Sequence, residues 1–504
     1  MDAMEIRKAV KQGKPVDIGA LCDCIENLTK ALAQADKTIA DLTKKIEELS
    51  KSNRLDQPYS VSAFERAQAL AAAKNGKKPK RSKNSTTKPG RKLNLSKLQA
   101  AIRTEQVLPA GLHKDECVLS HTRPVWRLEE NKAVIVAYEV WVHKKTKTYG
   151  KIPGVIGRGG FGIEFILAVA YQVYTLGLSM DKVVLLTQFF QKLKIGKSQI
   201  DAMLNQLAKH LEGEFDTLCS LAANSMILHA DETSWSIHSV WALLSEKARI
   251  VLHGVHKDGS TLETILDPKT FGGLVNSDDA AVYGRFSKTQ KCWAHLLRKA
   301  IRICLLAPDE KRYVTLRDGL YDIYRSAKKL KEDRRFSDDG RHNAMIDLQN
   351  KLYALIEPEC ENHFGKSYEG VLEDYRLLLN ELLKLNADDA LFTFVTTADA
   401  VRPNGTKMPA SGNNNESERS LRNPAMARDT DRASKTIPGA KRRTIIVSTI
   451  ESLRCFVKAF TLESITNEFL SWQANGLSCF SHELNKIKDA IRLTGILGKL
   501  YPTP

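Results

Sequence analysis

The sequence predicts an α+β fold in which a mixed β-sheet is interrupted by a helical insertion and preceded by a coiled coil and a helix-turn-helix region. Three observations support this prediction. Short, strand-like apolar runs cluster between residues 226 and 294. A stretch rich in Leu, Lys, Arg and Glu, which is typical of helices, follows over residues 311–385. A heptad repeat of apolar residues occupies residues 18–49.

Composition narrows the class of protein. The chain has 504 residues, enough for several domains, and a formal net charge of +17. A protein this basic most often binds a polyanion, nucleic acid before acidic membrane, although an evenly basic solvated surface is the alternative. The nine cysteines are few, odd in number and scattered, which favours reduced thiols in the cytoplasm over a disulfide framework. Residues 1–17 are too polar for a signal peptide.

The N-terminal segment 1–55 is predicted to be a coiled-coil dimerisation helix. Its apolar residues alternate spacings of three and four, with Lys and Glu on the flanks. Because the apolar stripe is narrow, self-association is favoured over a hairpin packed on the protein's own body. The stripe consists of Ile18, Leu21, Ile25, Leu28, Leu32, Ala35, Ile39, Leu42, Ile46 and Leu49.

Segment 56–105 is predicted to be a basic disordered linker. Between Lys74 and Lys92, nine of nineteen residues are Lys or Arg and none is acidic. The alternative is a solvated tether without a partner, but this charge density favours contact with DNA phosphates. The linker residues that we expect to contact DNA are Lys77, Lys78, Lys80, Arg81 and Lys83.

Two small regions precede the main sheet. Segment 106–158 contains a predicted strand over 134–142. It also holds four scattered residues that resemble a zinc site only loosely, namely His113, Cys117, His121 and His143, so we expect no bound zinc.

In segment 159–222, residues 159–180 predict a buried helix, with a membrane span disfavoured by Glu164 and Gln172. Residues 179–211 predict two helices broken near Ile195–Gly196, with Ser198 as the second N-cap. This pair is either a DNA-binding helix-turn-helix, with Lys197 at the DNA, or an ordinary helix pair.

The predicted catalytic sheet begins at residues 226–235, MILHADETSW, which read as a buried strand ending on Asp231. Further strands are predicted over 239–244, 249–255, 272–277 and 290–294, and the strand over 272–277 ends at Asp278 and Asp279. We divide the rest of the chain into a first core part (223–303), a helical insertion and loop (304–412), a second core part (413–475) and a C-terminal helical tail (476–504). In the second core part, a helix from Asn413 carries Glu418, residues 428–443 form a basic segment broken by Gly and Pro, and an apolar helix spans 444–460.

Three acids stand out in this arrangement: Asp231, Asp278 and Glu418. Clustered carboxylates in a basic protein suit Mg²⁺, which prefers oxygen ligands and substrate phosphate. Two such ions can stabilise the attacking and leaving oxygens of an in-line phosphoryl displacement. Spacing alone does not select these three among 59 acids, because Asp231 could cap a strand and Glu418 could pair with Arg422.

Four local strings are more specific: HADET around Asp231, SDDAAVY from Ser277, CWAHLLRK from Cys292 and NNNESERSLR from Asn413. In this order they resemble the TnpC-type transposases of bacterial insertion sequences, insertion-sequence family 66. The family belongs to the DDE transposases, whose catalytic core has a ribonuclease-H-like fold. The resemblance implies Mg²⁺-dependent DNA strand cleavage and strand transfer at the ends of an insertion sequence. The alternative is a catalytically inactive or cleavage-only DNA-binding protein derived from such an enzyme.

The resemblance also assigns roles. Asp231 matches the first acid, Asp278 the second because Tyr283 follows five residues later, and Glu418 the third, although Asp279 stands where the family usually has Gly. The triad would bind two Mg²⁺ ions, for which Mn²⁺ can substitute. Asn414 and Asn415 are expected to position the helix of Glu418 by capping or turn hydrogen bonds. The expected DNA contacts near the triad are His295, Arg298, Arg419, Arg422, Arg428, Lys435, Arg442 and Arg443.

The implied partners are DNA, as terminal repeats and target, a second copy of the chain, and small accessory proteins of the same element. No membrane partner is expected, and the implied location is the bacterial cytoplasm at the nucleoid. The family commonly carries paired cysteines before its helix-turn-helix, whereas only Cys117 stands there in this sequence, so 106–158 would be a degenerate zinc-ribbon-like region.

Overall fold

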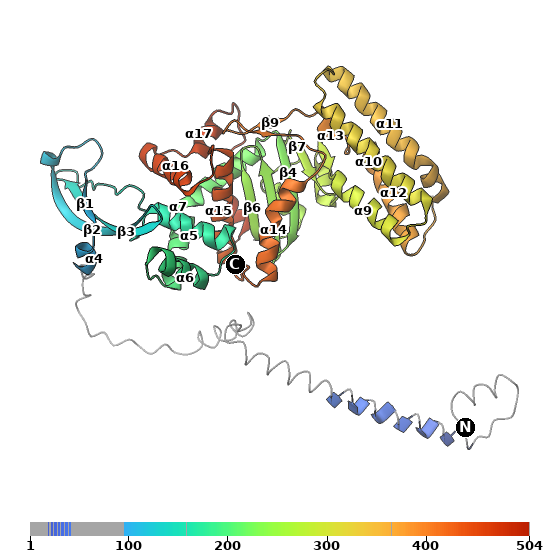
Figure 1. Cartoon of the computed structure of the whole chain (residues 1–504), viewed down its shortest axis with the longest axis horizontal. Helices are drawn as coiled ribbons and strands as arrows, with labels where there is room; N and C mark the ends of the chain where they lie inside the picture. Colours follow the sequence, from blue (N-terminus) through green and yellow to red (C-terminus); the bar gives the residue numbers. More distant parts are fainter. Residues whose placement is uncertain are drawn as a thin grey trace. The chain divides into compact units, whose positions relative to one another are not determined.

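The computed structural model describes residues 95–502 except 158 and 364, and, nearer the N-terminus, residues 19, 22–23, 25–27, 29–30, 32–34, 36–38 and 40–41 (Figure 1). The chain divides into two compact units, Met1–Lys92 and Leu93–Pro504. The predicted basic linker contacts Lys77, Lys78, Lys80, Arg81 and Lys83 lie outside the described residues.

In the first unit, the described residues between 19 and 41 are helical, as the heptad pattern predicts. The hydroxyl groups of Thr29 and Thr38 donate to carbonyls four residues earlier, at 2.8 and 2.9 Å. Ile25 and Leu32 of the apolar stripe are 56% and 66% exposed. These exposed side chains suit a coiled coil, and self-association through the stripe stays a prediction.

The second unit opens with a short helix and a three-stranded sheet. Helix α4 (Leu95–Gln99) is followed by β1 (Arg103–Val107), the turn η1 (Lys114–Glu116), β2 (Cys117–Glu129) and β3 (Lys132–His143). The sheet order is β1-β3-β2. Glu130 and Asn131 join β2 to β3 with φ of 47° and 62°, the left-handed conformation that a two-residue hairpin loop requires. The predicted strand over 134–142 is therefore confirmed within β3.

The predicted helix pair is present, but its second helix begins differently. Helix α5 (Ile163–Ala170) continues through η2 (Tyr171–Thr175) to α6 (Met180–Gln191) and α7 (Lys197–Ala223). The N-cap of α7 is Gly196, not Ser198, because the Gln199 side chain accepts a hydrogen bond from the Gly196 amide at 2.9 Å. Leu204, Leu211 and Phe215 of α7 are buried in the largest hydrophobic core. The second helix therefore supports the main sheet, and a DNA-binding role for the pair stays a prediction.

The central sheet is mixed, as predicted. It contains β4 (Ile227–Ser234), β5 (Ser239–Ser245), β6 (Arg249–Val255), β7 (Leu274–Ser277) and β8 (Thr289–Lys291), with α8 (Gly259–Glu263) and η3 (Ala281–Arg285) between strands. The order is β6-β5-β4-β7-β8. The β6-β5-β4 pairs are antiparallel and the β4-β7-β8 pairs are parallel. Parallel pairing brings the C-terminal ends of β4 and β7 to the same edge, where ligands commonly bind in such sheets.

The prediction that the first strand ends at Asp231 is wrong. Strand β4 runs on to Ser234 because residues 231–234 pair with β5, Asp231 opposite Ala242 and Ser234 opposite Ser239. Its pairing with β7, in contrast, ends at His229, opposite Asn276. Asp231 therefore stands where β4 has separated from β7 but is still held by β5.

Helices follow β8, as predicted for residues 304–412, but the first begins at Trp293, within the strand predicted over 290–294, because β8 ends at Lys291. The helices are α9 (Trp293–Leu306), α10 (Lys311–Glu332), α11 (Asp338–His363), α12 (Val371–Ala387) and α13 (Thr393–Thr396). They share a hydrophobic core of their own, and Figure 1 shows them gathered beyond the β7 side of the sheet. A hairpin of β9 (Ala400–Val401) and β10 (Lys407–Met408) leads back to the sheet.

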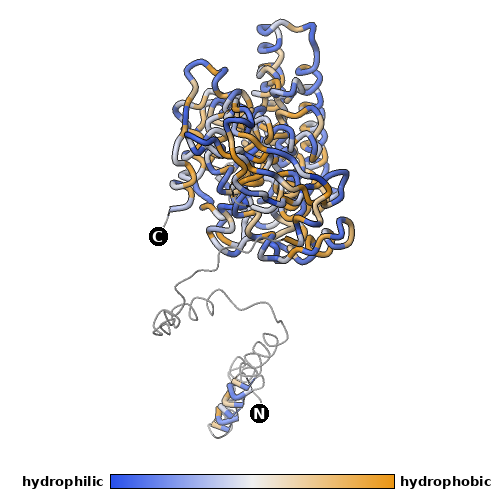
Figure 2. Tube along the Cα trace, turned by 90° about the vertical axis from the view of Figure 1, so that its left-hand side faces the viewer, coloured by the Kyte–Doolittle hydropathy of each residue, from blue (hydrophilic) through white to orange (hydrophobic). Residues whose placement is uncertain are grey.

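The last helices cover both faces of the sheet. They are α14 (Asn415–Asp429), α15 (Ile437–Ser452), η4 (Leu453–Cys455), α16 (Leu462–Asn475), α17 (Cys479–Asn485) and α18 (Ile496–Leu500). Leu421 of α14 packs with Val240, Ala242 and Val251 on one face of the sheet. Ile446 of α15 packs on the other face together with α7. Figure 2 shows the hydrophobic segments concentrated inside this body and the hydrophilic ones along its outer loops.

The predicted basic segment before the apolar helix is partly helical. Helix α15 begins at Ile437, not at Thr444, because the Thr436 side chain accepts a hydrogen bond from the Gly439 amide at 3.2 Å. Pro438 lies in the first turn, where its missing amide hydrogen is not needed. Arg442 and Arg443 therefore lie on α15. In the part of the chain that the structure describes, no helix combines the length and the apolar character needed to cross a bilayer.

Helix α15 closes the β6 edge of the sheet with hydroxyl groups one helical turn apart. The backbone amides of His253, Val251 and Arg249 donate to the hydroxyl oxygens of Thr444, Ser448 and Ser452 at 2.8, 3.0 and 2.9 Å. The close approach needs small residues, since a Cβ at Gly254 would lie 2.8 Å from that of Ala440. An edge strand that would otherwise expose unpaired amides is thus covered by a helix.

We predict that Thr444→Val lowers the free energy of unfolding by about 1–3 kcal/mol, because the buried His253 amide and the buried Tyr501 hydroxyl both lose their Thr444 partner. Thr449→Val is the matched control, since the Thr449 hydroxyl is equally buried but bonds only the Ile445 carbonyl of its own helix, at 2.8 Å. Urea unfolding of both variants measures the difference. Equal destabilisation by the two substitutions would contradict the role assigned to the hydroxyl groups.

Candidate active site

The two aspartates meet through the register of the parallel pair. His229 of β4 lies opposite Asn276 of β7, so Asp231 and Asp278, two residues further along each chain, come level with each other. The Asp231 carboxylate accepts a hydrogen bond from the Glu232 amide at 2.9 Å, and that of Asp278 accepts from the Ala280 amide at 3.0 Å. Both carboxylates are thus anchored to the backbone at the point where the strands part.

The charges of neighbouring acids act on Asp231. Burial, as the largest cause, and the charges of Asp278, Glu232 and Glu418 together raise the pKa of Asp231 to about 7. All of these charges are negative, so the site gathers carboxylates that repel one another. Oxygen donors with unbalanced negative charge fit a hard divalent cation.

Asp278 suits the site better than its neighbour. Asp278 is half-buried and acts on the pKa of Asp231, whereas Asp279 is exposed. The buried Lys291 side chain donates to the Asp278 carbonyl at 2.9 Å and to the Ser277 hydroxyl at 3.3 Å. These bonds hold the chain at the end of β7.

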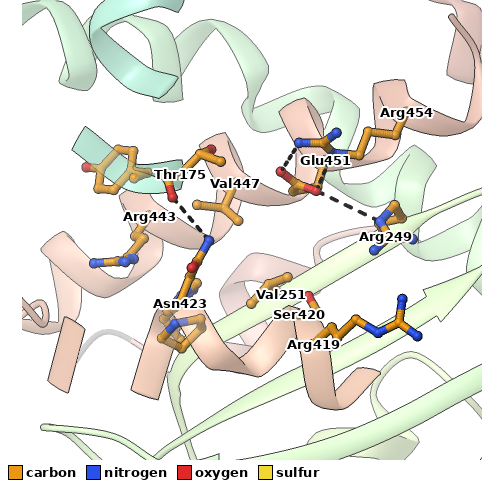
Figure 3. A pocket seen from close by; sticks show the side chains of 13 residues that line it. Thr175, Arg249, Val251, Arg419, Ser420, Asn423, Arg443, Val447, Glu451 and Arg454 are labelled. Carbon is orange, nitrogen blue, oxygen red and sulfur yellow. Dashed lines mark hydrogen bonds and ion pairs between the residues drawn. The ribbon is translucent and has the colours of Figure 1, made fainter. Parts of the chain in front are cut away.

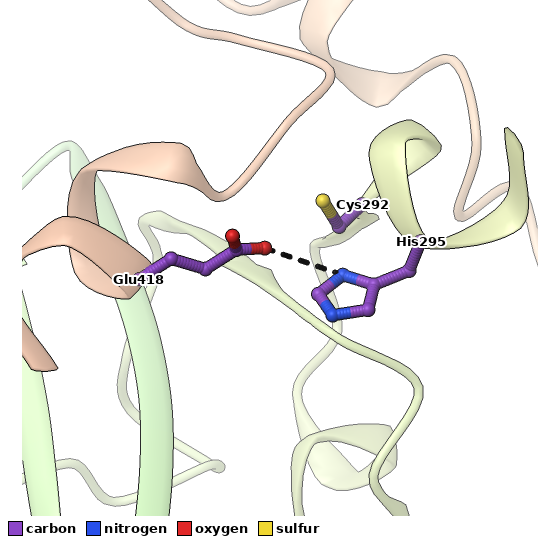
Figure 4. Close-up of side chains that lie close together, drawn as sticks. All are labelled: Cys292, His295 and Glu418. Atoms are coloured by element: carbon purple, nitrogen blue, oxygen red, sulfur yellow. Dashed lines mark ion pairs between the residues drawn. The ribbon is translucent and has the colours of Figure 1, made fainter. Parts of the chain in front are cut away.

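Glu418 comes from α14 and is held toward α9. Its carboxylate accepts a hydrogen bond from Arg298 at 2.7 Å and lies 3.6 Å from the His295 Nδ1 atom. Figure 4 shows Glu418 and His295 facing each other, with Cys292 beside them. Among the described residues, one group of at least three His, Cys, Asp or Glu side chains has ligand atoms that all lie within 4.8 Å of one another. Its members are Cys292, His295 and Glu418. Asp231 and Asp278 act on this region by charge but are not members of that group.

Asn414 positions the helix of Glu418, but not as a cap. Its side chain makes no capping hydrogen bond to α14, which corrects the expectation for this residue. Instead its Nδ2 atom donates to the Ala230 carbonyl at 2.7 Å, and its Oδ1 atom lies 3.1 Å from the His229 Nδ1 atom. Since an amide oxygen only accepts hydrogen bonds, the His229 Nδ1 atom is the donor to Asn414. Burial lowers the pKa of His229.

Two further bonds complete this attachment. The backbone amide of Asn414 donates to the Cys292 sulfur at 3.2 Å. The side chain of Asn276 on β7 donates to the carbonyls of Ser411 and Asn413 at 2.6 and 3.0 Å. The start of α14 is therefore bound to β4, β7 and α9 together. The sequence patterns do not single out His229 and Asn276, although each lies two residues before a predicted acid and so on the same face of its strand.

Glu232 occupies the other face of the sheet. Its carboxylate accepts a hydrogen bond from the fully buried Tyr283 hydroxyl and lies 3.5 Å from the Lys257 ammonium. Tyr283 thus links η3, just after Asp278, to β4. Glu232 is a charged neighbour of Asp231 on the opposite face of the sheet, and its charge raises the pKa of Asp231.

The predicted DNA contacts fall into two groups. Arg419 and Arg422 are exposed on α14 beside Glu418. The others make contacts within the chain: Arg428 with Ser234 at 2.7 Å, Lys435 with Asp431 at 2.7 Å, Lys197 with Asp181 at 3.0 Å and Arg442 with Asn205 at 2.9 Å. Arg443 is only 4% exposed, and its guanidinium lies 5.1 Å from the centre of the Trp235 ring.

A pocket of about 310 Å³ lies between α14, α15 and β6 (Figure 3). Arginine side chains dominate its polar lining: Arg249, Arg419, Arg443 and Arg454. Glu451 offsets part of this charge, 2.7 Å from Arg454 and 4.0 Å from Arg249. The lining is therefore net positive, and it reaches from Arg419 on α14 to strand β6 at the edge of the sheet.

We predict that Asp231→Asn stabilises the metal-free protein increasingly as pH rises. The raised pKa means that the folded state binds the proton more tightly than the unfolded state, so this contribution to stability is lost as pH rises through about 7. The gain in the variant should approach at most about 4 kcal/mol above that pH, at about 1.4 kcal/mol per pKa unit. Urea unfolding in a chelator at pH 5 to 8, with exposed Asp279→Asn as control, measures it. A gap that stays constant with pH would contradict the raised pKa of Asp231.

Comparison with known proteins shows the family of this chain. A search of curated proteins finds no match. The sequence model of the transposase IS66 family matches residues 158–442, more than half of the 504 residues. The match spans the central sheet, the helical insertion and the three acids. The chain therefore belongs to the IS66 transposase family.

Proposed function

We propose that this protein is a DDE-type DNA transposase that cleaves DNA strands at the ends of an insertion sequence and transfers them to a target, with Asp231, Asp278 and Glu418 as the catalytic acids. The observation that carries the proposal is the register of β4 and β7, which brings Asp231 and Asp278 level where the two strands part, while the start of the Glu418 helix is bonded to β4 through Asn414. The three acids come from a mixed sheet and a covering helix, which suits a ribonuclease-H-like core. Membership of a transposase family supports DNA as the substrate.

The donor set fits a hard metal ion. Bound by these carboxylates, two Mg²⁺ ions, for which Mn²⁺ can substitute, would supply the Lewis acidity for in-line displacement at a DNA phosphate. Asp231 and Asp278 are anchored by backbone amides, so they keep their places without a ligand. Glu418 is held by Arg298 and must turn from that guanidinium to join them.

Basic residues around the acids provide the contacts for the DNA backbone. Arg419 and Arg422 extend from α14 without burial, and they would neutralise phosphate charge next to the reacting strand. His295 and Arg298 on α9 border the site from the other side. Contacts through Arg428, Lys435, Arg442 and Lys197 would require their present partners to be exchanged for phosphate. We leave Arg443 out of the proposed set because it is buried.

The remaining segments would organise the complex. The N-terminal helix would pair two copies, and the basic linker and the helix pair α6–α7 would hold the terminal repeats. Small accessory proteins of the same element are proposed partners, and the proposed location is the bacterial cytoplasm at the nucleoid.

We predict that Asp231→Ala, Asp278→Ala and Glu418→Gln each lower Mg²⁺-dependent strand cleavage by roughly 10³-fold, since a lost metal ligand removes about 4 kcal/mol of transition-state stabilisation. The substrate is DNA that carries the ends of the encoding element, and gel-shift titration should show retained binding. Asp279→Ala, at the exposed neighbour, is the control. A parent protein that binds but does not cut, or mutants that cut as well as the parent, would refute the triad.

A pre-cut DNA end separates the two remaining functions. A transposase joins a DNA with a free 3′-hydroxyl to target DNA without a cleavage step, and the triad variants lose this activity too. A protein that only cleaves would leave the pre-cut DNA unjoined under conditions in which it cuts intact ends.

A further inference from the structure

The group formed by Cys292, His295 and Glu418 has a composition different from that of the three acids. It offers one sulfur, one nitrogen and one carboxylate oxygen, with all three ligand atoms within 4.8 Å of one another (Figure 4). Cys292 is the N-cap of α9, and His295 follows one helical turn later, so the helix presents both toward α14. Glu418 completes the group from the facing helix.

Two members of the group are already placed for a ligand. The Cys292 thiol is buried and not in a disulfide, and its sulfur accepts the Asn414 amide at 3.2 Å, which fixes its position. The His295 Nδ1 atom is buried yet has no hydrogen-bond partner. Its neighbour, the Glu418 carboxylate, lies 3.6 Å away, beyond hydrogen-bond distance. A buried polar atom without a partner is rare in folded proteins and calls for an explanation.

We infer that Cys292, His295 and Glu418 form a binding site for a thiophilic divalent cation of the Zn²⁺ type. Zinc combines thiolate, imidazole and carboxylate ligands in tetrahedral sites, with bonds of about 2.0–2.3 Å, so its ligand atoms lie roughly 3.5 Å apart. The three ligand atoms therefore need to move only slightly closer together to bind zinc. On binding, the Cys292 thiol releases its proton to solvent and the His295 Nδ1 atom gains the partner that it lacks. Mg²⁺ prefers oxygen ligands and does not match this set.

The site has a regulatory consequence, which rests on the proposed function. Glu418 belongs both to this group and to the proposed catalytic triad, and one carboxylate does not serve both at once. A thiophilic ion held by α9 keeps Glu418 away from Asp231 and Asp278. Zinc would then inhibit strand cleavage by occupying the third acid.

Titration with Co²⁺, which takes the place of Zn²⁺ and is visible by absorption, tests the site without any DNA. The full chain is used with Cys22→Ser and Cys24→Ser, so that the N-terminal cysteines do not contribute. We expect the ligand-field bands of four-coordinate cobalt and a thiolate-to-cobalt charge-transfer band, both removed by added Zn²⁺. Cys292→Ser should abolish the charge-transfer band, and Glu418→Gln should raise the Kd for Co²⁺ at least about tenfold, or 1.4 kcal/mol.

Cys304→Ser is the matched control, because Cys304 is a buried thiol on the same helix but outside the group. It should keep the charge-transfer band, and circular dichroism shows that each variant is folded. The inference is overturned if the band is absent from the parent or survives Cys292→Ser. A protein that binds cobalt as expected but cuts no DNA would refute only the proposed function. In a protein that cuts, Zn²⁺ should inhibit the parent more strongly than Cys292→Ser, each relative to its own zinc-free rate.

Discussion

The hydrogen bonds of Asn414 are the constraint on which the rest of the site depends. The buried Asn414 side chain bonds the carbonyl of Ala230 and the ring of His229, and the backbone amide of the same residue donates to the sulfur of Cys292. Residues from three distant parts of the chain are thereby fixed against one another: a sheet strand, the start of the helical insertion and the helix that follows that insertion. Because each partner is buried, leaving any of them unpaired would cost free energy. The position of Glu418, one helical turn beyond Asn414, follows from this attachment.

The sheet supplies the other half of the site by ending its pairing at a defined place. Strands β4 and β7 pair as far as His229 and Asn276 and then separate. The next residues on the same face, Asp231 and Asp278, therefore lie where the two strands no longer pair with each other. Their charges repel, and this repulsion adds to the larger effect of burial in raising the pKa of Asp231. The fold tolerates it because stabilising contacts lie elsewhere, among them the hydroxyl groups of α15 that pair the β6 edge. Functional sites often hold such unfavourable arrangements that the surrounding structure supports.

Much of the fold could be predicted from local patterns. The apolar runs over 239–244 and 249–255, the helical insertion and the helix of Glu418 all depend on periodicity that is visible in the sequence. Several element ends were wrong because hydrogen bonds that the hydrophobic pattern does not show decide them. Strand β4 continues through polar residues since β5 pairs with them, α7 has Gly196 as its N-cap since the Gln199 side chain accepts from the Gly196 amide, and α15 begins at Ile437 since Thr436 caps it.

The site could be predicted only in part. The acids were found through the ordered strings around them, and their strand positions placed Asp231 and Asp278 at one edge. The roles of His229, Asn276 and Asn414 depend on contacts across about 140 to 185 residues, for which a single sequence carries no signal. The burial of Arg443 likewise follows from the start of α15 and not from its basic surroundings.

A crystal structure of the protein with Mn²⁺, located by its anomalous scattering, tests most directly whether the three acids form one metal site. We predict manganese between Asp231 and Asp278, with Glu418 turned from Arg298 to join them. Manganese absent from the two aspartates, or bound only where Glu418 faces His295, would contradict this prediction.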